Sequence, residues 1–116
     1  MSLTEKDSQY LWHPYTQHKT ASAPIAITKG KGALLWDENS KEYIDAIASW
    51  WVNPYGHSNT FIAEAIYKQL TTLEHVLFGG FTHQPAVEVA EKLLAILPKN
   101  QQKLFFSDNG STAVEI

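Results

Sequence analysis

The chain has 116 residues, of which 44% are apolar and 12% aromatic, so its composition is that of a globular domain and not of a disordered segment. Its nine basic residues are all lysines and are outnumbered by 12 acidic residues, giving a net charge of -3. The absence of arginine excludes arginine-based recognition of carboxylates or bases by these residues, and the absence of cysteine excludes disulfides, thiolate metal sites and a cysteine nucleophile.

Residues 1–24 mix polar and aromatic side chains without a sustained period and contain Pro14 and Pro24. They predict an irregular arm that lies on a larger body. The first residues lack the basic and then apolar pattern of a signal peptide, and no apolar run approaches the roughly 18 residues of a membrane span. We therefore expect a cytoplasmic protein with neither a membrane nor a nucleic acid as its partner.

Three short β-prone runs follow the arm, at residues 25–28, 33–36 and 42–46. Two turn-forming stretches, Gly-Lys-Gly at 30–32 and Asp-Glu-Asn-Ser-Lys at 37–41, separate them. The pattern predicts a three-stranded antiparallel meander.

Two helices are predicted next. The first begins after Ser58 or Asn59, either of which can cap it, and carries an apolar stripe of Ile62, Ile66, Leu70 and Leu73. The second begins near Pro85, a residue type favoured in the first helical turn, and ends at Pro98.

The last stretch predicts a buried strand at residues 103–107 and then a third helix that opens with a Thr112 to Glu115 capping box. This helix has only its first turn, which cannot bury an apolar face, so we expect the protein to continue beyond Ile116. A small antiparallel lobe followed by the opening of a layered α/β structure is the predicted fold class.

Residues 105–113, Phe-Phe-Ser-Asp-Asn-Gly-Ser-Thr-Ala, carry the clearest chemical signal. A strand that feeds a short Gly and Ser/Thr loop into a helix brings free N–H groups, hydroxyls and the positive end of a helix dipole together, which suits a phosphate. The stretch matches neither a Walker loop nor the GxGxxG fingerprint. An ordinary capped turn between a strand and a helix is the alternative.

Two aromatic clusters are further candidates. Trp50 and Trp51 follow the third predicted strand, where one could face a pocket while the other packs in a core, although core packing of both is the simpler interpretation. Residues 11–16, Leu-Trp-His-Pro-Tyr-Thr, could line a ligand site or anchor the arm. The five histidines include no helix-spaced pair that favours a metal site, and none of the nine lysines stands out as a nucleophile.

Four blocks in order resemble the class III aminotransferases, which use pyridoxal 5'-phosphate (PLP). They are residues 12–16 (Trp-His-Pro-Tyr-Thr), 49–51 (Ser-Trp-Trp), 75–83 (His-Val-Leu-Phe-Gly-Gly-Phe-Thr-His) and 110–115 (Gly-Ser-Thr-Ala-Val-Glu). The last block is shared across these enzymes, whereas the first two resemble the members that aminate 8-amino-7-oxononanoate to 7,8-diaminononanoate for biotin synthesis. One departure is Gly-His-Ser-Asn-Thr at 56–60, where relatives usually have Gly-His-x-His-Pro.

The resemblance implies a PLP-dependent transferase of fold type I that works as a homodimer. Gly110 and Ser111 would then hold the cofactor phosphate, while Trp51 and Tyr15 would contact 8-amino-7-oxononanoate. The amino donor would be S-adenosylmethionine, or lysine in some members. No catalytic residue is expected in this segment, because the lysine that binds the cofactor covalently, the aspartate at its ring nitrogen and the arginine for the substrate carboxylate all lie further along in relatives.

The resemblance also divides the chain. Residues 1–56 would form the arm and the meander of the small domain, and residues 57–116 would begin the large PLP-binding domain. Two other functions stay open: another class III ω-aminotransferase with a different acceptor, and a non-catalytic binding or interaction module that kept a phosphate loop.

Overall fold

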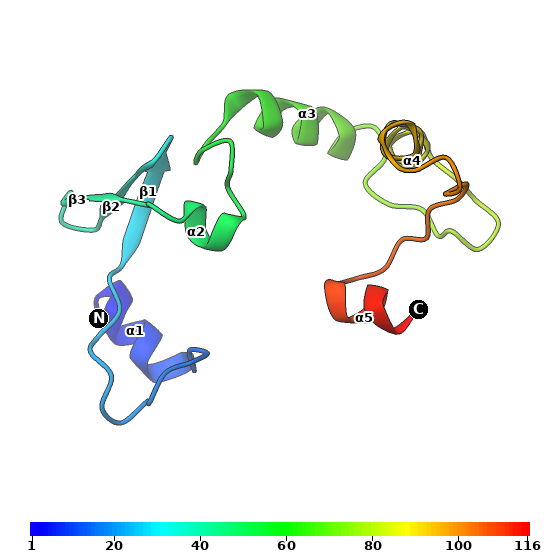
Figure 1. The fold of residues 1–116 in the computed structure, drawn as a ribbon. Coiled ribbons are helices and arrows are strands. Elements are labelled where there is room, and N and C mark those ends of the chain that lie inside the picture. Colours follow the sequence, from blue (N-terminus) through cyan, green and yellow to red (C-terminus); the bar gives the residue numbers. More distant parts are fainter. The chain divides into compact units, whose positions relative to one another are not determined.

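The computed structural model describes residues 1–116 as two units, Met1–Lys68 and Gln69–Ile116 (Figure 1). The first unit contains α1 (Leu3–Tyr10), β1 (Ile27–Lys31), β2 (Leu34–Asp37), β3 (Glu42–Ile44), α2 (Ala48–Trp51) and most of α3 (Thr60–Leu70). The second contains the end of α3, then α4 (Gln84–Ile96) and α5 (Gly110–Glu115). The domain division between residues 56 and 57 stays a prediction.

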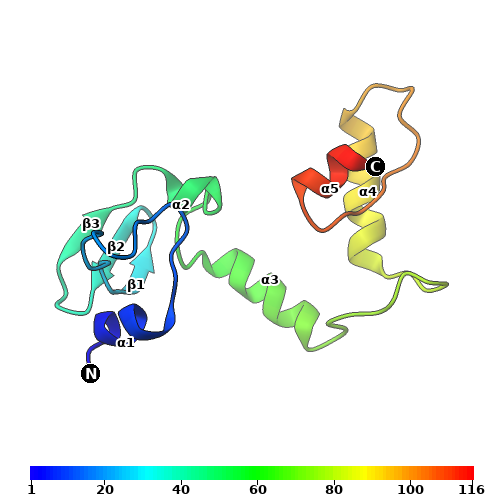
Figure 2. The same cartoon turned by 90° about the horizontal axis from the view of Figure 1, so that it is seen from below.

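The predicted meander is confirmed. The three strands form one sheet in the order β1-β2-β3, with both neighbouring pairs antiparallel, so that β2 lies in the middle (Figure 2). Between β1 and β2 the chain turns at Gly32, whose φ of 59° lies in the left-handed region that glycine adopts without steric cost. A register shift between Ile27 and Lys29 marks a bulge in β1.

Asp37 holds the turn between β2 and β3. One carboxylate oxygen accepts the backbone N–H groups of Asn39 and Lys41, each at 2.9 Å, and the other accepts the Tyr43 hydroxyl at 2.9 Å. The hydrogen bond from the Lys41 N–H, followed by those from Tyr43 and Asn39, lowers the pKa of Asp37. The hydrogen bond between the Tyr43 hydroxyl and Asp37 raises the pKa of Tyr43. The turn residues predicted from composition thus have a specific acceptor that organises them.

The prediction of an irregular arm is wrong for its first part, because residues 3–10 form α1. A complete capping box begins this helix: Glu5 N–H donates to Ser2 Oγ at 3.1 Å, and Ser2 N–H donates to Glu5 Oε2 at 2.7 Å. The Ser-x-x-Glu spacing was a readable signal for a helix start. The helix has no sustained apolar stripe, and none of its residues is buried.

The two middle helices are confirmed, although α3 ends at Leu70 and leaves Leu73 of the predicted stripe outside the helix. Asn59 Oδ1 accepts the N–H of Ile62 at 3.2 Å at the start of α3, and Pro85 lies in the first turn of α4, which ends shortly before Pro98.

The expected strand at 103–107 is wrong for this chain. No strand within the described residues pairs with it, and a strand forms only where its backbone groups find a partner. The start of the last helix also differs, since α5 is capped by Asn109 and Thr112 lies inside its first turn.

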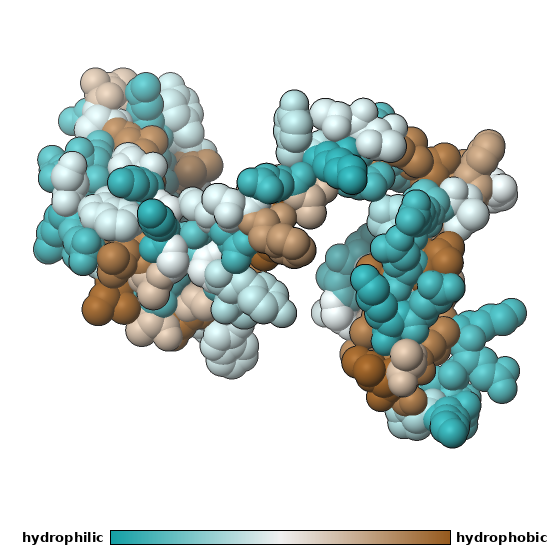
Figure 3. All heavy atoms as spheres, turned by 90° about the horizontal axis from the view of Figure 1, so that it is seen from above, coloured by the Kyte–Doolittle hydropathy of each residue, from teal (hydrophilic) through white to brown (hydrophobic).

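The apolar residues do not form a core within these 116 residues, contrary to what the composition suggested. None of them is buried, and the strands make the only contacts between named elements. Figure 3 shows apolar side chains on the surface of both units. On α4, Val89 is 45% exposed and Leu93 is 37% exposed, so apolar side chains of this helix are left without a partner element in their own unit. No helix combines the length and the apolar character that crossing a bilayer requires.

Candidate functional site

The start of α5 offers unpaired donors. Asn109 Oδ1 accepts both the N–H of Thr112 at 2.9 Å and its hydroxyl at 3.2 Å, which fixes the first turn. The N–H groups of Gly110 and Ser111 and the Ser111 hydroxyl make no hydrogen bond within the chain. Three donors are therefore free at the positive end of the helix, next to a cap that already satisfies Thr112.

Gly110 has no structural reason within the chain to be glycine. A Cβ placed on it would meet no atom within 4 Å, and Gly110 is absent from the residues with positive φ. The space beside its backbone is thus open, which leaves room for a ligand to approach the chain closely.

An aromatic cluster lies ahead of this loop. Phe78 stacks on His83, with centroids 5.2 Å apart and planes 6° from parallel, and its ring also contacts Phe106 at 5.7 Å. These contacts tie the 75–83 block to the segment that leads into α5. Sequence reasoning selected both stretches but not their contact.

Tyr15 and Trp51 belong to the first unit, whereas Gly110 and Ser111 belong to the second. Tyr15 is fully exposed, has a φ of 55° and makes no contact with Trp51. Its neighbour Trp12 is 84% exposed, and its ring centroid lies 6.4 Å from that of His18. The arm is instead fixed through His13, whose Nε2 lies 2.8 Å from Asp7 Oδ2 on α1.

The tryptophan pair lies in a left-handed turn. Ala48, Ser49, Trp50 and Trp51 have φ values of 49°, 49°, 64° and 65°, so α2 has the hand opposite to an ordinary helix. Packing of both tryptophans into a core is wrong for this chain, because Trp50 is 79% and Trp51 80% exposed. Their rings stack on each other, with centroids 6.5 Å apart.

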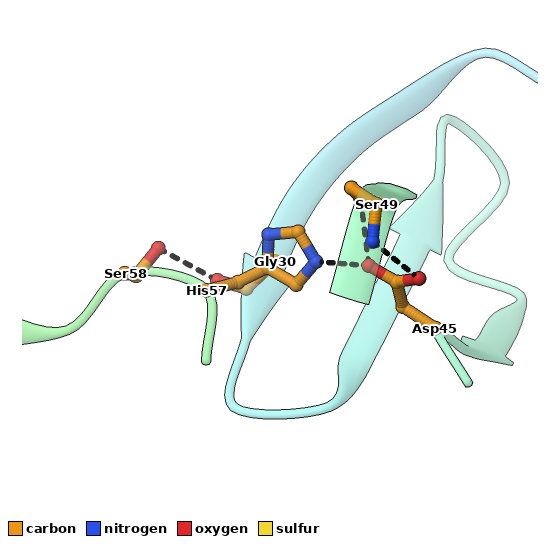
Figure 4. A network of polar contacts seen from close by, with 5 residues as sticks. All are labelled: Gly30, Asp45, Ser49, His57 and Ser58. Atoms are coloured by element: carbon orange, nitrogen blue, oxygen red, sulfur yellow. Dashed lines mark hydrogen bonds and ion pairs between the residues drawn. The ribbon is translucent and has the colours of Figure 1, made fainter. Parts of the chain in front are cut away.

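One polar network was not foreseen from the sequence. His57 Nε2 lies 2.6 Å from Asp45 Oδ2, and the Ser49 hydroxyl donates to the same oxygen at 2.7 Å (Figure 4). The Ser49 hydroxyl and then its N–H, with His57 third, lower the pKa of Asp45 from 3.8 to about 2. Ser49 is bonded to the carboxylate and not to the imidazole, so the three residues lack the order of a hydrolase triad.

Comparison with known proteins decides the family. The family described as aminotransferase class-III matches residues 15–116. The chain belongs to the class-III aminotransferases. The matched residues contain three of the four blocks read from the sequence, at 49–51, 75–83 and 110–115, and the end of the fourth, at 12–16.

Among its relatives, the chain is similar to the adenosylmethionine-8-amino-7-oxononanoate aminotransferase of Synechococcus elongatus, with 51% identity over 92% of this chain and 25% of that protein. The enzyme of the same name from Staphylococcus aureus is 47% identical over 98% of this chain and 26% of its own length. The chain spans about a quarter of the length of these curated relatives.

Solved structures agree with this assignment. The adenosylmethionine-8-amino-7-oxononanoate aminotransferase of Methanocaldococcus jannaschii superposes with a TM-score of 0.89 at 40% identity, covering 97% of this chain and 26% of that one. An ω-transaminase from Pseudomonas jessenii, solved in complex with PMP, gives a TM-score of 0.89 at 38% identity over 99% of this chain and 26% of its own. The predicted fold class, the amino-terminal part of a class III aminotransferase, is confirmed.

Proposed function

We propose that this chain is the amino-terminal portion of an enzyme that transfers an amino group from S-adenosylmethionine, or from lysine, to 8-amino-7-oxononanoate, forming 7,8-diaminononanoate for biotin synthesis. The observation that carries the proposal is the 51% and 47% identity to two relatives of that name over nearly the whole chain. Because the chain spans about a quarter of those relatives, the activity belongs to the full-length protein.

Gly110 and Ser111 would hold the phosphate of PLP. The residues present fit this group, because two N–H groups and one hydroxyl are free there and no atom of the chain lies within 4 Å of the place that a Gly110 Cβ would take. Bound PLP supplies the electron sink that amino transfer requires. The task of this chain is to bind and orient the phosphate, with Asn109 keeping the first turn of α5 in place.

Trp51 and Tyr15 would contact the acceptor substrate. Both side chains are exposed within this chain, and each offers an apolar face together with a polar hydrogen-bonding tip. The lysine that carries the cofactor, the aspartate and the arginine are expected from the rest of the enzyme, as the resemblance implies. Those residues would supply the covalent and charge-pairing chemistry that this segment lacks.

The lack of buried apolar residues supports a larger assembly. The exposed faces of α3 and α4 fit surfaces covered by the rest of the polypeptide or by a second subunit. We expect a homodimer located in the cytoplasm, in line with the resemblance. Size-exclusion chromatography with light scattering of the full-length protein would report the dimer directly, and a monomer at micromolar concentration would contradict it.

Another class III ω-aminotransferase is the second candidate. It is supported by the similarity to the Pseudomonas jessenii enzyme, whose TM-score equals that of the Methanocaldococcus jannaschii enzyme. The identity of 38% is lower than the 51% and 47% found with the biotin-pathway relatives, which favours the first candidate.

Genetic complementation tests the function. The full-length gene is introduced into a bacterial strain that lacks its own enzyme for making 7,8-diaminononanoate, and growth is scored without biotin. We expect growth with the native gene and none with a Ser111→Asp variant, which places a carboxylate against the phosphate. If the native protein accumulates and binds PLP while the strain grows only when fed 7,8-diaminononanoate, the acceptor is a different molecule and the proposal fails.

A further inference from the structure

The segment between Asp45 and His57 is a loop closed at both ends on the turn between β1 and β2. At one end Asp45 N–H donates to the Ala33 carbonyl at 2.8 Å. At the other, Gly32 and His57 exchange two backbone hydrogen bonds, at 2.9 and 3.0 Å. Since Gly32 and Ala33 are consecutive, the loop begins and ends side by side, with the tryptophan pair between its two ends.

Within this loop the left-handed turn needs contacts that hold it. Each non-glycine residue in the left-handed helical region costs roughly 1–2 kcal/mol, and four such residues follow one another at Ala48–Trp51. Asp45 supplies side-chain contacts to this turn: its Oδ1 accepts the Ser49 N–H at 2.9 Å and its Oδ2 accepts the Ser49 hydroxyl at 2.7 Å.

His57 in turn fixes the Asp45 carboxylate. Its ring lies 2.6 Å from Asp45 Oδ2, and the two side chains are only 16% and 6% exposed, so the contact is largely shielded from water. His57 has little room to move, because a Cβ on Gly30 would lie 2.9 Å from His57 Cβ. The contacts run from His57 through Asp45 to Ser49, which lies in the turn at Ala48–Trp51 (Figure 4).

The tryptophan rings have no other support in this unit. They are about four-fifths exposed, and their only ring contact is with each other. Their direction is therefore set by the backbone of the turn and by whatever holds that backbone in place.

We propose that Asp45 and His57 are positioning residues, which fix the left-handed turn at Ala48–Trp51 and thereby aim the Trp51 ring at the acceptor substrate. The substrate part rests on the proposed function, in which Trp51 lines the acceptor site. Neither Asp45 nor His57 touches substrate or cofactor. Both act through the backbone that carries Trp51.

The test uses the full-length holoenzyme and the Asp45→Ala, His57→Ala and His57→Gln variants. The alanine variants are expected to raise KM for 8-amino-7-oxononanoate about ten- to hundredfold, because small misplacements at a site cost that much. The PLP affinity and the rate of amino transfer from the donor to the enzyme should stay within about twofold. His57→Gln retains an N–H donor at a similar distance from the backbone and should recover most of the acceptor KM.

Ser58→Ala is the matched control. It removes a neighbouring hydrogen bond, from the Ser58 hydroxyl to the Gly30 carbonyl at 2.8 Å, without touching Asp45. The acceptor KM of this variant should equal that of the native enzyme. A crystal structure of the Asp45→Ala holoenzyme should show residues 48–51 outside the left-handed region.

The outcomes separate this inference from the function it rests on. If Asp45→Ala keeps both the turn and the acceptor KM, or if PLP binding and donor turnover fall together with the acceptor KM, the positioning role is wrong. If the turn changes shape while acceptor KM stays constant in Asp45→Ala and also in Trp51→Ala, the assignment of Trp51 to the acceptor site fails, and the substrate part of this inference fails with it.

Discussion

The Gly30→Ala substitution tests the packing between β1 and His57. The added Cβ would lie 2.9 Å from His57 Cβ, 3.0 Å from His57 Cγ and 3.2 Å from Leu35 Cδ2, whereas carbon atoms pack best at about 3.5–4.0 Å. His57 cannot simply swing away, since its own Cβ is attached to a backbone held by two hydrogen bonds to Gly32. Gly30 does not have a positive φ, so crowding and not backbone strain is the expected cause of any effect.

Overpacking of this kind costs about 1–3 kcal/mol. We expect this cost to appear as local opening, so backbone amides of residues 28–60 should exchange with deuterium about 5- to 150-fold faster in the full-length protein. Hydrogen exchange followed by mass spectrometry measures this directly. Lys31→Ala, an exposed position on the same strand, is the control and should change exchange by less than about threefold. Exchange in Gly30→Ala that matches the native protein would refute the claim that His57 is closely confined.

Three further predictions concern the site. Hydrogen bonds hold the pKa of Asp45 near 2, below its ordinary value of 3.8, so its contribution to stability is complete above about pH 4 and is lost as the pH falls towards 2. The stability difference between the native protein and Asp45→Asn, measured by acid unfolding, should therefore shrink over that window, and a pH-independent difference would contradict the prediction. Ser111→Asp should weaken PLP binding about ten- to hundredfold, measured by titrating the apoenzyme with PLP. Gly110→Ala should also weaken PLP binding, but without lowering the melting temperature in thermal unfolding. Unchanged PLP affinity in both variants would show that residues 110 and 111 do not bind the phosphate. Tyr15→Phe and Trp51→Ala should lower kcat/KM for 8-amino-7-oxononanoate while PLP stays bound, which corresponds to a loss of about 1–3 kcal/mol of transition-state stabilisation. Loss of PLP with unchanged steady-state kinetics for the acceptor would contradict the placement of both residues at the acceptor site.

Local signals in the sequence accounted for much of the fold. Pro85 and Pro98 bracket α4, and Asn59 caps α3, because both effects act within one or two helical turns. The meander followed from β-prone runs separated by turn residues, and Asp37 shows why the second turn forms where it does. These elements depend on neighbours in the sequence.

The errors arose where structure depends on distant partners or on rare backbone states. Residues 103–107 have the composition of a buried strand, but a strand needs another strand beside it, and none of the three strands of this chain pairs with these residues. The left-handed turn at Ala48–Trp51 could not be expected, since non-glycine residues seldom have positive φ. It brings Ser49 onto Asp45, and the fold brings His57 there from 12 residues away. No spacing rule would have paired these three residues, although Gly32 and Gly56 mark the close backbone approach that makes the pairing possible.

The amino-transfer reaction itself tests the central claim most directly. The full-length protein is purified, loaded with PLP and incubated with 8-amino-7-oxononanoate and either S-adenosylmethionine or lysine, and 7,8-diaminononanoate is quantified by mass spectrometry. The account predicts product with at least one of these donors, dependent on PLP and strongly reduced by Trp51→Ala. Absence of product with both donors, from a protein that binds PLP and aminates a different carbonyl acceptor, would contradict it.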